Sequence, residues 1–232
     1  MIVGLIGYDS IRKHLAACGY YTAEIREKYY LRIADAYIDI KEQRGQYWLE
    51  NIMKDRFAVS MFGQKRLSRE GGIEIVVKEL CTRMARDGCQ VTCYNRSGHH
   101  VSGAEYDNKI EYDGIRQKFV PTIERKGLAA VSSSFFAALY SAFGKYDVVH
   151  IHAEGPAFFS WLPKMFRKRV VVTIHGIDWQ REKWKSGFGS KFIRQGEKNA
   201  VKYADEIIVL SKGVQDYFKD TYQGCRNQRE KS

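Results

Sequence analysis

The sequence predicts an α/β fold in which a parallel sheet carries helices on both faces, a Rossmann-like arrangement. Three β-branched runs, "DVVHIH", "RVVVTIHG" and "DEIIVLS", are apolar along their length rather than at alternate positions. Strands of this kind are buried on both faces, as in parallel sheets, and the stretches between the runs have helical spacing. The domain is expected at residues 56–222, after a helical segment at residues 1–55 and before a polar tail at residues 223–232.

Residues 1–55 form the first predicted unit. In "TAEIREKYYLRIADAYIDIK", at residues 22–41, apolar side chains recur at helical spacing with charges between them. The segment contains no group of residues that indicates chemistry. We interpret it as a helical appendage that packs on the domain or docks a partner.

The predicted domain begins with a strand, a loop and a helix. "FAVSMF" at residues 57–62 is the strand, "GQKRLSRE" at residues 63–70 is the loop, and Gly71 and Gly72 open the helix. One face of this helix is apolar, and Gly88 stands where a helix C-cap belongs.

A strand and a hairpin are expected next. "QVTCYN" at residues 90–95 is the strand, and "NKIEYDGIRQKFV" at residues 108–120 indicates a hairpin that turns at Asp113 and Gly114. The three β-branched runs then complete the parallel sheet.

The composition is that of a basic protein of 232 residues, long enough for one sizeable domain with an appendage. Lys and Arg number 38 against 27 Asp and Glu, which gives a formal net charge of +11. This balance favours an anionic partner: nucleic acid, an anionic membrane face or a phosphorylated substrate. The five cysteines form no CxxC pair and no zinc-finger spacing, so free thiols in a reducing cytoplasm are expected.

Two observations on hydropathy predict a cytoplasmic protein. The first ten residues lack the basic start and the long apolar run of a signal peptide. No uncharged apolar stretch reaches the roughly 18 residues that a transmembrane helix needs. The longest candidate, at residues 127–144, is rich in small residues and is interpreted as a buried helix.

The loop before Gly71 and Gly72 predicts an anion site of no common type. A dinucleotide fingerprint would need a glycine at position 65, and a P-loop would need one where the chain has Ser68. What remains is a basic loop that leads into a helix N-terminus, where free N–H groups and the helix dipole favour an anion. The alternative is a glycine pair needed only for a tight turn.

Histidines stand at the ends of two predicted strands. His150, His152 and Glu154 belong to one strand end, and His175 belongs to the next. Ligands of parallel sheets bind beyond the carboxyl ends of the strands, so we expect these residues in one site with Gly72. The alternative for each histidine is a polar group satisfied inside the core. No third ligand has zinc-site spacing and G-x-S-x-G is absent, so neither a metal nor a serine hydrolase is expected.

Four stretches of the chain resemble, in the expected order, the N-terminal half of family 4 glycosyltransferases, which have the GT-B fold. They are "REGGIEIVVKELCTRMARDGCQVTCYNR", "YDVVHIHAEGPAF", "VVVTIHGIDWQREKW" and "ADEIIVLSKGVQDYF". The resemblance runs from about Phe57 to about Tyr222. It implies that residues 56–222 are the acceptor-side domain of such an enzyme, with the glycine loop near the diphosphate and sugar of a nucleotide sugar.

The resemblance also implies roles for single residues. Gly71 and Gly72 match the loop whose amides face the donor diphosphate, and His175 matches the catalytic-centre histidine that contacts the transferred sugar. His152 and Glu154 match the strand end that lines the acceptor side. The other implied substrate-binding residues are Gly176, Asp178, Trp179 and Arg181. The implied reaction is retaining and uses neither metal nor cofactor, and the donor phosphate helps to deprotonate the acceptor hydroxyl.

The family pattern includes a second domain of comparable size, which holds the nucleotide and carries two glutamates at E-x7-E spacing. The present sequence stops just after "YFKDTY", where the crossover into that domain is expected. We therefore expect a truncated enzyme that binds nucleotide sugars weakly alone and that needs a partner chain or a homo-oligomer for turnover.

The sequence thus predicts a domain for sugar transfer from a nucleotide-diphosphate sugar to a glycan or lipid-linked acceptor, in surface polysaccharide synthesis. The alternative is a non-catalytic binding module, or a split-enzyme subunit, that binds an acceptor or a partner chain. Nucleic-acid binding would rest on charge alone and is not expected, because the chain has no RNP-like aromatic motif and no helix-turn-helix pattern.

One further segment, "SWLPKMFRKR" at residues 160–169, combines aromatic and apolar side chains with four basic ones. Such a surface suits docking on an anionic leaflet, so a peripheral position at the inner membrane face is a further hypothesis. The alternative is a core helix followed by a solvated turn.

Overall fold

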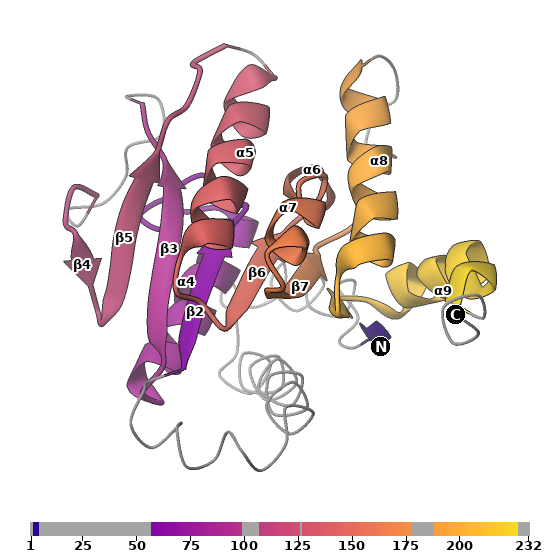
Figure 1. The fold of residues 1–232 in the computed structure, drawn as a ribbon, viewed down its shortest axis with the longest axis horizontal. Coiled ribbons are helices and arrows are strands. Elements are labelled where there is room, and N and C mark those ends of the chain that lie inside the picture. Colours follow the sequence, from indigo (N-terminus) through magenta and orange to yellow (C-terminus); the bar gives the residue numbers. More distant parts are fainter. Residues whose placement is uncertain (1, 5–56, 99–106, 126, 178–187, 227–232) are drawn as a thin grey trace, which may run out of the picture.

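The computed structural model describes residues 2–4, 57–98, 107–125, 127–177 and 188–226. These residues form an eight-stranded sheet in the order β1-β8-β7-β6-β2-β3-β5-β4, with helices on both faces (Figure 1). All neighbouring strands are parallel except β4 and β5. The predicted fold class is confirmed.

Strands and helices alternate along most of the described chain. The strands are β1 (Ile2–Gly4), β2 (Ala58–Phe62), β3 (Gln90–Arg96), β4 (Glu111–Tyr112), β5 (Ile115–Val120), β6 (Val148–His152), β7 (Arg169–Ile174) and β8 (Glu206–Val209). The helices are α4 (Gly72–Arg86), α5 (Leu128–Phe143), α6 (Glu154–Ala157), α7 (Trp161–Met165), α8 (Phe188–Tyr203) and α9 (Lys212–Arg226). The strands predicted from the three β-branched runs are β6, β7 and β8.

The central strands are apolar on both sides because helices cover each face of the sheet. In β6, Val148 belongs to a core shared with α4, whereas Val149 and Ile151 belong to a second core shared with α5, α7, α8 and α9. In β7, Val171 faces the first core and Val172 faces the second. Successive strand residues point to opposite faces, which explains why these runs are continuously apolar.

The predicted hairpin turn is confirmed. β4 and β5 pair antiparallel, with Tyr112 opposite Ile115. Asp113 and Gly114 between them have φ values of +52° and +78°. Two successive positive φ values are typical of the type I′ turn, which an Asp-Gly pair favours.

The helix predicted at residues 127–144 forms as α5, but only its small residues are buried. Its buried residues are Ser132, Ser133, Ser134, Ala137, Ala138, Ser141 and Ala142. Phe135, Tyr140 and Phe143 face outward and are 37%, 41% and 67% exposed. Small side chains allow α5 to lie close to the sheet, so the three aromatic side chains on its far side form part of the outer surface. Within the described ranges, none of the helices has the length and apolar character required to cross a bilayer.

Both ends of the chain differ from the predicted boundaries. Ile2–Gly4 form β1, which pairs in parallel with β8 at one edge of the sheet, whereas a helical segment was predicted there. An apolar run this short does not distinguish a strand from a helix by its periodicity. At the other end α9 continues to Arg226, into the predicted polar tail. Residues 5–56 and 227–232 lie outside the described residues.

Candidate functional site

The order of the strands reverses between β2 and β6. From β2 the sheet continues to β3 and β5 on one side, and from β6 it continues to β7 and β8 on the other. In open α/β sheets, ligands bind at such a switch point, beyond the carboxyl ends of the strands. The segments that leave β2, β6 and β7 at this point begin with Gly63, Ala153 and His175.

Gly63 brings the loop after β2 directly onto the end of β6. Its φ is +120°, and a Cβ atom at this position would lie 2.0 Å from the carbonyl oxygen of His152. Only glycine fits such a conformation and such a close approach to another backbone. The glycine that this turn requires is therefore Gly63, ahead of the Gly71-Gly72 pair that the sequence emphasised.

Three histidines form a row across β6 and β7, on the sheet face that α4 covers. The rings of His150 and His152 are stacked with centroids 4.3 Å apart, and those of His152 and His175 are 5.4 Å apart. His152 Nδ1 and His175 Nε2 share a hydrogen bond of 3.1 Å, and His150 Nε2 lies 2.7 Å from the hydroxyl of Thr173. The structure thus brings together His152 and His175, as expected from the two strand ends.

The histidine row is buried, which determines its charge. His150 and His152 are fully buried, and His175 is 9% exposed. Burial, reinforced by the nearby His175, lowers the pKa of His150 to about 3. Burial also lowers the pKa of His152 well below its usual value, reinforced by His150 and His175. Both imidazoles are therefore neutral near pH 7 and act as hydrogen-bonding groups. The alternative of a histidine satisfied in the core describes His150 well.

The two glycines at the start of α4 have different surroundings. A Cβ atom on Gly71 would lie 2.2 Å from a carboxylate oxygen of Glu74, whereas one on Gly72 would meet nothing within 4 Å. Glu74 lies in the first turn of α4 and accepts a hydrogen bond of 3.0 Å from the Lys65 backbone N–H. A tight turn against Glu74 explains Gly71. The space beside Gly72 is open and gives access to the helix N-terminus.

The other predicted site residues divide into three groups. Glu154 begins α6 and is fully buried. Gly176 follows His175 and is partly exposed. Asp178, Trp179 and Arg181 lie outside the described residues. In the part of the chain that the structure describes, no three His, Cys, Asp or Glu side chains are arranged to hold a metal ion.

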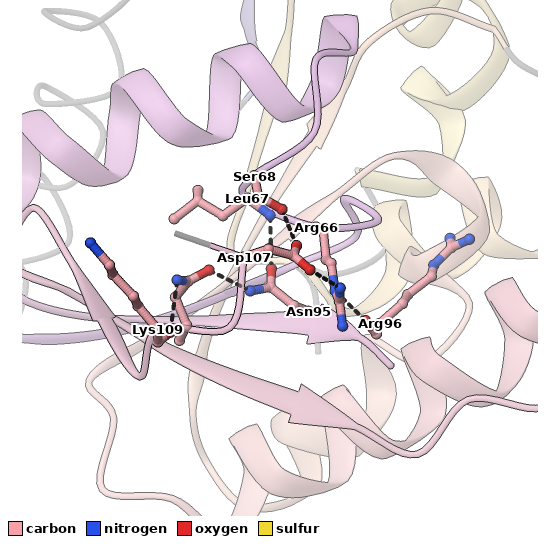
Figure 2. Close-up of polar contacts among 8 residues, drawn as sticks. Arg66, Leu67, Ser68, Asn95, Arg96, Asp107 and Lys109 are labelled. Carbon is pink, nitrogen blue, oxygen red and sulfur yellow. Dashed lines mark hydrogen bonds and ion pairs between the residues drawn. The ribbon is translucent and has the colours of Figure 1, made fainter. Parts of the chain in front are cut away.

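A buried polar network that the sequence did not reveal fixes the loop at residues 63–70 (Figure 2). Asn95, at the end of β3, is its centre. Its Oδ1 accepts a hydrogen bond of 3.0 Å from the Leu67 backbone N–H and lies 3.2 Å from Gln64 Nε2. Its Nδ2 donates to Gln117 Oε1 at 2.9 Å. The Asn95 side chain thus supplies the hydrogen-bond partner that a backbone carbonyl would otherwise give to the loop.

Asp107 adds a charged contact to this network. Its carboxylate accepts hydrogen bonds from Arg66 and from the Ser68 hydroxyl. Arg66 Nε also donates to the Arg96 carbonyl oxygen at 3.0 Å, and its guanidinium lies 4.7 Å from the ring centre of Phe119. Arg66 is therefore a structural cation of the loop, although the sequence presented the loop simply as basic.

A small pocket lies beside this loop, on the sheet face that α5 covers. It has a volume of about 10 Å³, which is enough for about one water molecule. Its lining residues are Phe62, Gly63, Gln64, Tyr94, Arg96, Val120, Ser133, Ser134 and Ala137. The loop at the switch point therefore has the histidine row on one face of the sheet and this small pocket on the other.

Comparison with solved structures shows the same fold in a larger protein. A sucrose-phosphate synthase from Thermosynechococcus elongatus is similar with a TM-score of 0.56 and 18% identity, over 71% of this chain and 45% of that one. Anabaena Alr3699/HepE, in complex with UDP and glucose, gives a TM-score of 0.43 and 12% identity, over 66% of this chain and 38% of that one. The second similarity is too low to support an argument. The regions matched span less than half the length of either protein.

Comparison of the sequence with families and with curated proteins gave one positive result. No curated protein matches the chain. The sequence model of Glycosyltransferase Family 4 matches residues 70–229, more than half of the chain. This range begins just before α4 and includes the switch-point segments that follow β6 and β7. The family match and the fold together confirm what the four sequence stretches indicated: the chain belongs to Glycosyltransferase Family 4 and has the fold of the N-terminal domain of a GT-B enzyme.

Proposed function

We propose that this chain supplies the acceptor-side domain of an enzyme that moves a sugar from a nucleotide-diphosphate sugar to a glycan or lipid-linked acceptor, in surface polysaccharide synthesis. One observation carries the proposal: Gly63, His152 and His175 meet at the switch point of a parallel sheet. The family supports glycosyl transfer in general. The donor, the acceptor and the biosynthetic role are parts of the proposal.

His175 is the residue that we propose contacts the transferred sugar. Its hydrogen bond to His152 fixes the orientation of its ring, and a group positioned in advance stabilises a transition state more effectively than a mobile one. His152 and Glu154 are fully buried, so we assign them a supporting place beneath the acceptor side. The open approach to Gly72 would admit the donor diphosphate to the N-terminus of α4.

We propose a retaining reaction without a metal, in which an oxygen of the donor diphosphate accepts the proton of the attacking hydroxyl. A separate donor-binding domain, on this polypeptide or on a partner, would hold the nucleotide. The pyrophosphate that develops charge in the transition state needs dipoles and cations on both sides. The helix N-terminus and the neutral histidines of this domain supply only part of that environment.

The first prediction concerns turnover. We expect the purified 232-residue chain to transfer no sugar above background from a panel of nucleotide sugars. When a family 4 donor-binding domain is fused to the chain, we expect the fused protein to transfer sugar. In the fused protein, His175→Ala should lower kcat by about 100-fold to 1,000-fold. Transfer is measured with radiolabelled donors and lipid-linked acceptors.

A matched variant of the histidine row controls for this loss. His150→Gln changes a buried histidine of the row that has no proposed contact with the sugar, and it should lower kcat only a few-fold. Rapid transfer by the isolated chain would contradict the need for a donor domain. Acceptor binding without transfer in the fused protein would favour the alternative of a non-catalytic binding module.

The surface around α7 favours peripheral membrane binding through its apolar side chains rather than through its basic ones. Phe143, Met165 and Phe166 are 67%, 68% and 42% exposed, and the rings of the two phenylalanines lie 4.5 Å apart. The basic residues of the segment are largely occupied. Lys164 and Arg169 pair with Asp205, and Lys168 donates to two backbone carbonyl oxygens. We therefore propose that apolar insertion, rather than these cations, drives docking to the inner membrane face.

The second prediction tests this membrane surface. We expect the chain to float with phosphatidylcholine vesicles, and anionic lipid to strengthen binding by less than tenfold. Replacing both Phe143 and Phe166 with serine should abolish flotation. Ile110→Ser is the control, since Ile110 is 77% exposed but lies next to the β4–β5 hairpin, away from this surface. Equal flotation of the double variant and the control would contradict the proposal.

A further inference from the structure

The pocket beside the switch-point loop contains polar atoms that the described protein leaves without partners. Gln64 is 2% exposed, and its Nε2 lies near three acceptors: Cys93 Sγ at 2.9 Å, the Tyr94 carbonyl oxygen at 2.8 Å and Asn95 Oδ1 at 3.2 Å. Its Oε1 is buried and has no hydrogen-bond partner among the described residues. The amide is therefore fixed by one end, and its free acceptor belongs to a residue that lines the pocket.

Two donors from other elements line the same pocket. Arg96 ends β3, and its buried Nε has no hydrogen-bond partner within the described ranges. Figure 2 shows its guanidinium extending away from the Asp107 network. Ser134, from α5, is 4% exposed and also lines the pocket, where its hydroxyl can donate a hydrogen bond. Buried polar groups in native proteins almost always have partners, so the unpartnered Gln64 oxygen and Arg96 nitrogen at one pocket indicate a missing polar group that both accepts and donates hydrogen bonds.

The charge around the pocket indicates that this group is anionic. Burial lowers the pKa of the Arg96 guanidinium from its usual value. The nearby Glu74 carboxylate raises this pKa, whereas the nearby Arg69 lowers it further. Arg96 is thus a partly buried cation close to a second cation. Asp107 is already engaged by Arg66 and Ser68, and Glu74 by the Lys65 backbone N–H. An anion in the pocket would offset the free-energy cost of burying the Arg96 charge and of placing it near Arg69.

The size of the pocket limits what enters it. A volume of about 10 Å³ holds about one small group, such as one oxygen of a carboxylate or phosphate. The remainder of the ligand would stay outside, toward the switch-point loop. A single bound water is the simplest competing occupant. It would satisfy Gln64 and Ser134, but it would not balance the charge of Arg96.

We propose that this pocket recognises one anionic oxygen group, from a phosphate or a carboxylate, on a hydroxyl-bearing acceptor. Arg96 is the charged partner, Ser134 donates a hydrogen bond, and Gln64 Oε1 accepts one from a neighbouring ligand hydroxyl. The identification of the ligand as an acceptor rests on the proposed function, whereas the anion pocket itself does not. Within that function, the inference narrows the acceptor to negatively charged sugars or sugar derivatives.

Binding to the full chain tests the pocket without any transfer reaction. Glucose 6-phosphate, glucuronate and glucose serve as probes in calorimetric titrations, so that the phosphate, carboxylate and neutral arms are separate. We expect one or both charged probes to bind and glucose to bind at least tenfold more weakly. Arg96→Gln should weaken the charged probe at least tenfold, and Ser134→Ala should weaken it a few-fold. Arg86→Gln is the control, because it removes one positive charge from a 70% exposed side chain and should leave binding unchanged.

Two features keep the test decisive. The Arg96 contacts that stabilise the loop use its backbone N–H and carbonyl, so replacing its side chain should leave the fold intact. Ser134→Asp provides an independent route, because a carboxylate placed in the pocket should abolish binding of both charged probes. Equal affinity of wild type and Arg96→Gln, or equal affinity for glucose and the charged probes, would overturn the proposal and favour a bound water.

The outcome for this pocket is distinguishable from that for the proposed function. Suppose that the chain fused to a donor domain glycosylates neutral and charged acceptors equally, and that Arg96→Gln does not change this. The proposal that the pocket recognises an anion is then contradicted, and the proposed transferase function is supported. If no acceptor is glycosylated but Arg96-dependent binding of charged sugars is measured, the proposed anion recognition is supported and the proposed transferase function is contradicted.

Discussion

The folded domain should lose stability steeply as the pH falls below about 6.5, because the unfolded chain then binds protons that the folded chain excludes. Burial lowers the pKa of His150 to about 3 and that of His152 well below its usual value. Their contribution to stability is complete above the unfolded pKa of about 6.5 and is lost as the pH falls toward the folded values. Within that window each buried histidine should remove about 1.4 kcal/mol per pH unit.

Urea unfolding between pH 7.5 and pH 4.5 measures this effect. His150→Gln removes one of the two titrating groups, so its free energy of unfolding should depend less steeply on pH, by about 1.4 kcal/mol per unit. Carboxylates also titrate toward the acid end of this range, which is why the comparison between the two proteins, rather than either slope alone, is decisive. Identical slopes for the variant and the wild type would show that His150 is not held neutral by the fold.

Gly63→Ala should destabilise the domain by about 3 kcal/mol or more. The new Cβ would lie 2.0 Å from the His152 carbonyl oxygen, and φ is +120°, where an L-residue is strained. The clash is with backbone at the centre of the sheet, so a side-chain rotation cannot relieve it. Thermal and urea unfolding of the purified variant measure the loss.

Gly72→Ala is the matched control for this substitution. A Cβ on Gly72 would meet nothing within 4 Å, and the residue begins a helix. The change should therefore alter stability by less than about 1 kcal/mol, with stabilisation expected. If Gly72 admits the donor diphosphate as proposed, the same variant should raise KM for the nucleotide sugar in the fused protein. Equal stability of the two variants would contradict the close contact at Gly63.

The sequence predicted the elements of this fold well because their signals are local. Continuous apolar runs marked β6, β7 and β8, and an Asp-Gly pair marked the hairpin between β4 and β5. His152 and His175 stand at the carboxyl ends of neighbouring parallel strands, and this placed them together. Each of these inferences needed only a window of a few residues and a general rule of sheet geometry.

The contacts that define the site were not predictable in the same way, because they join residues far apart in the chain. Asn95 reaches the Leu67 backbone across 28 positions, and Asp107 reaches Arg66 across 41. Polar residues of this kind are common on surfaces, and nothing in the sequence distinguishes those that the fold buries. The same applies to Lys164, which the sequence presented as a membrane-facing cation. It pairs with Asp205, 41 positions further along.

The seam between β2 and β6 has a consequence for how the protein acquires its activity during folding. Val59 pairs with Val91 on one side, 32 positions away, but with Val148 on the other, 89 positions away. Contacts that span more of the chain close larger loops and form later. The strand groups β2-β3-β5-β4 and β6-β7-β8 should therefore assemble first and join afterwards, with the still longer-range pairing of β1 and β8 outside this comparison. Because Gly63 meets His152 only at this junction, partly folded chains would possess much of the sheet but no switch-point site, and ligand binding would report the completion of folding.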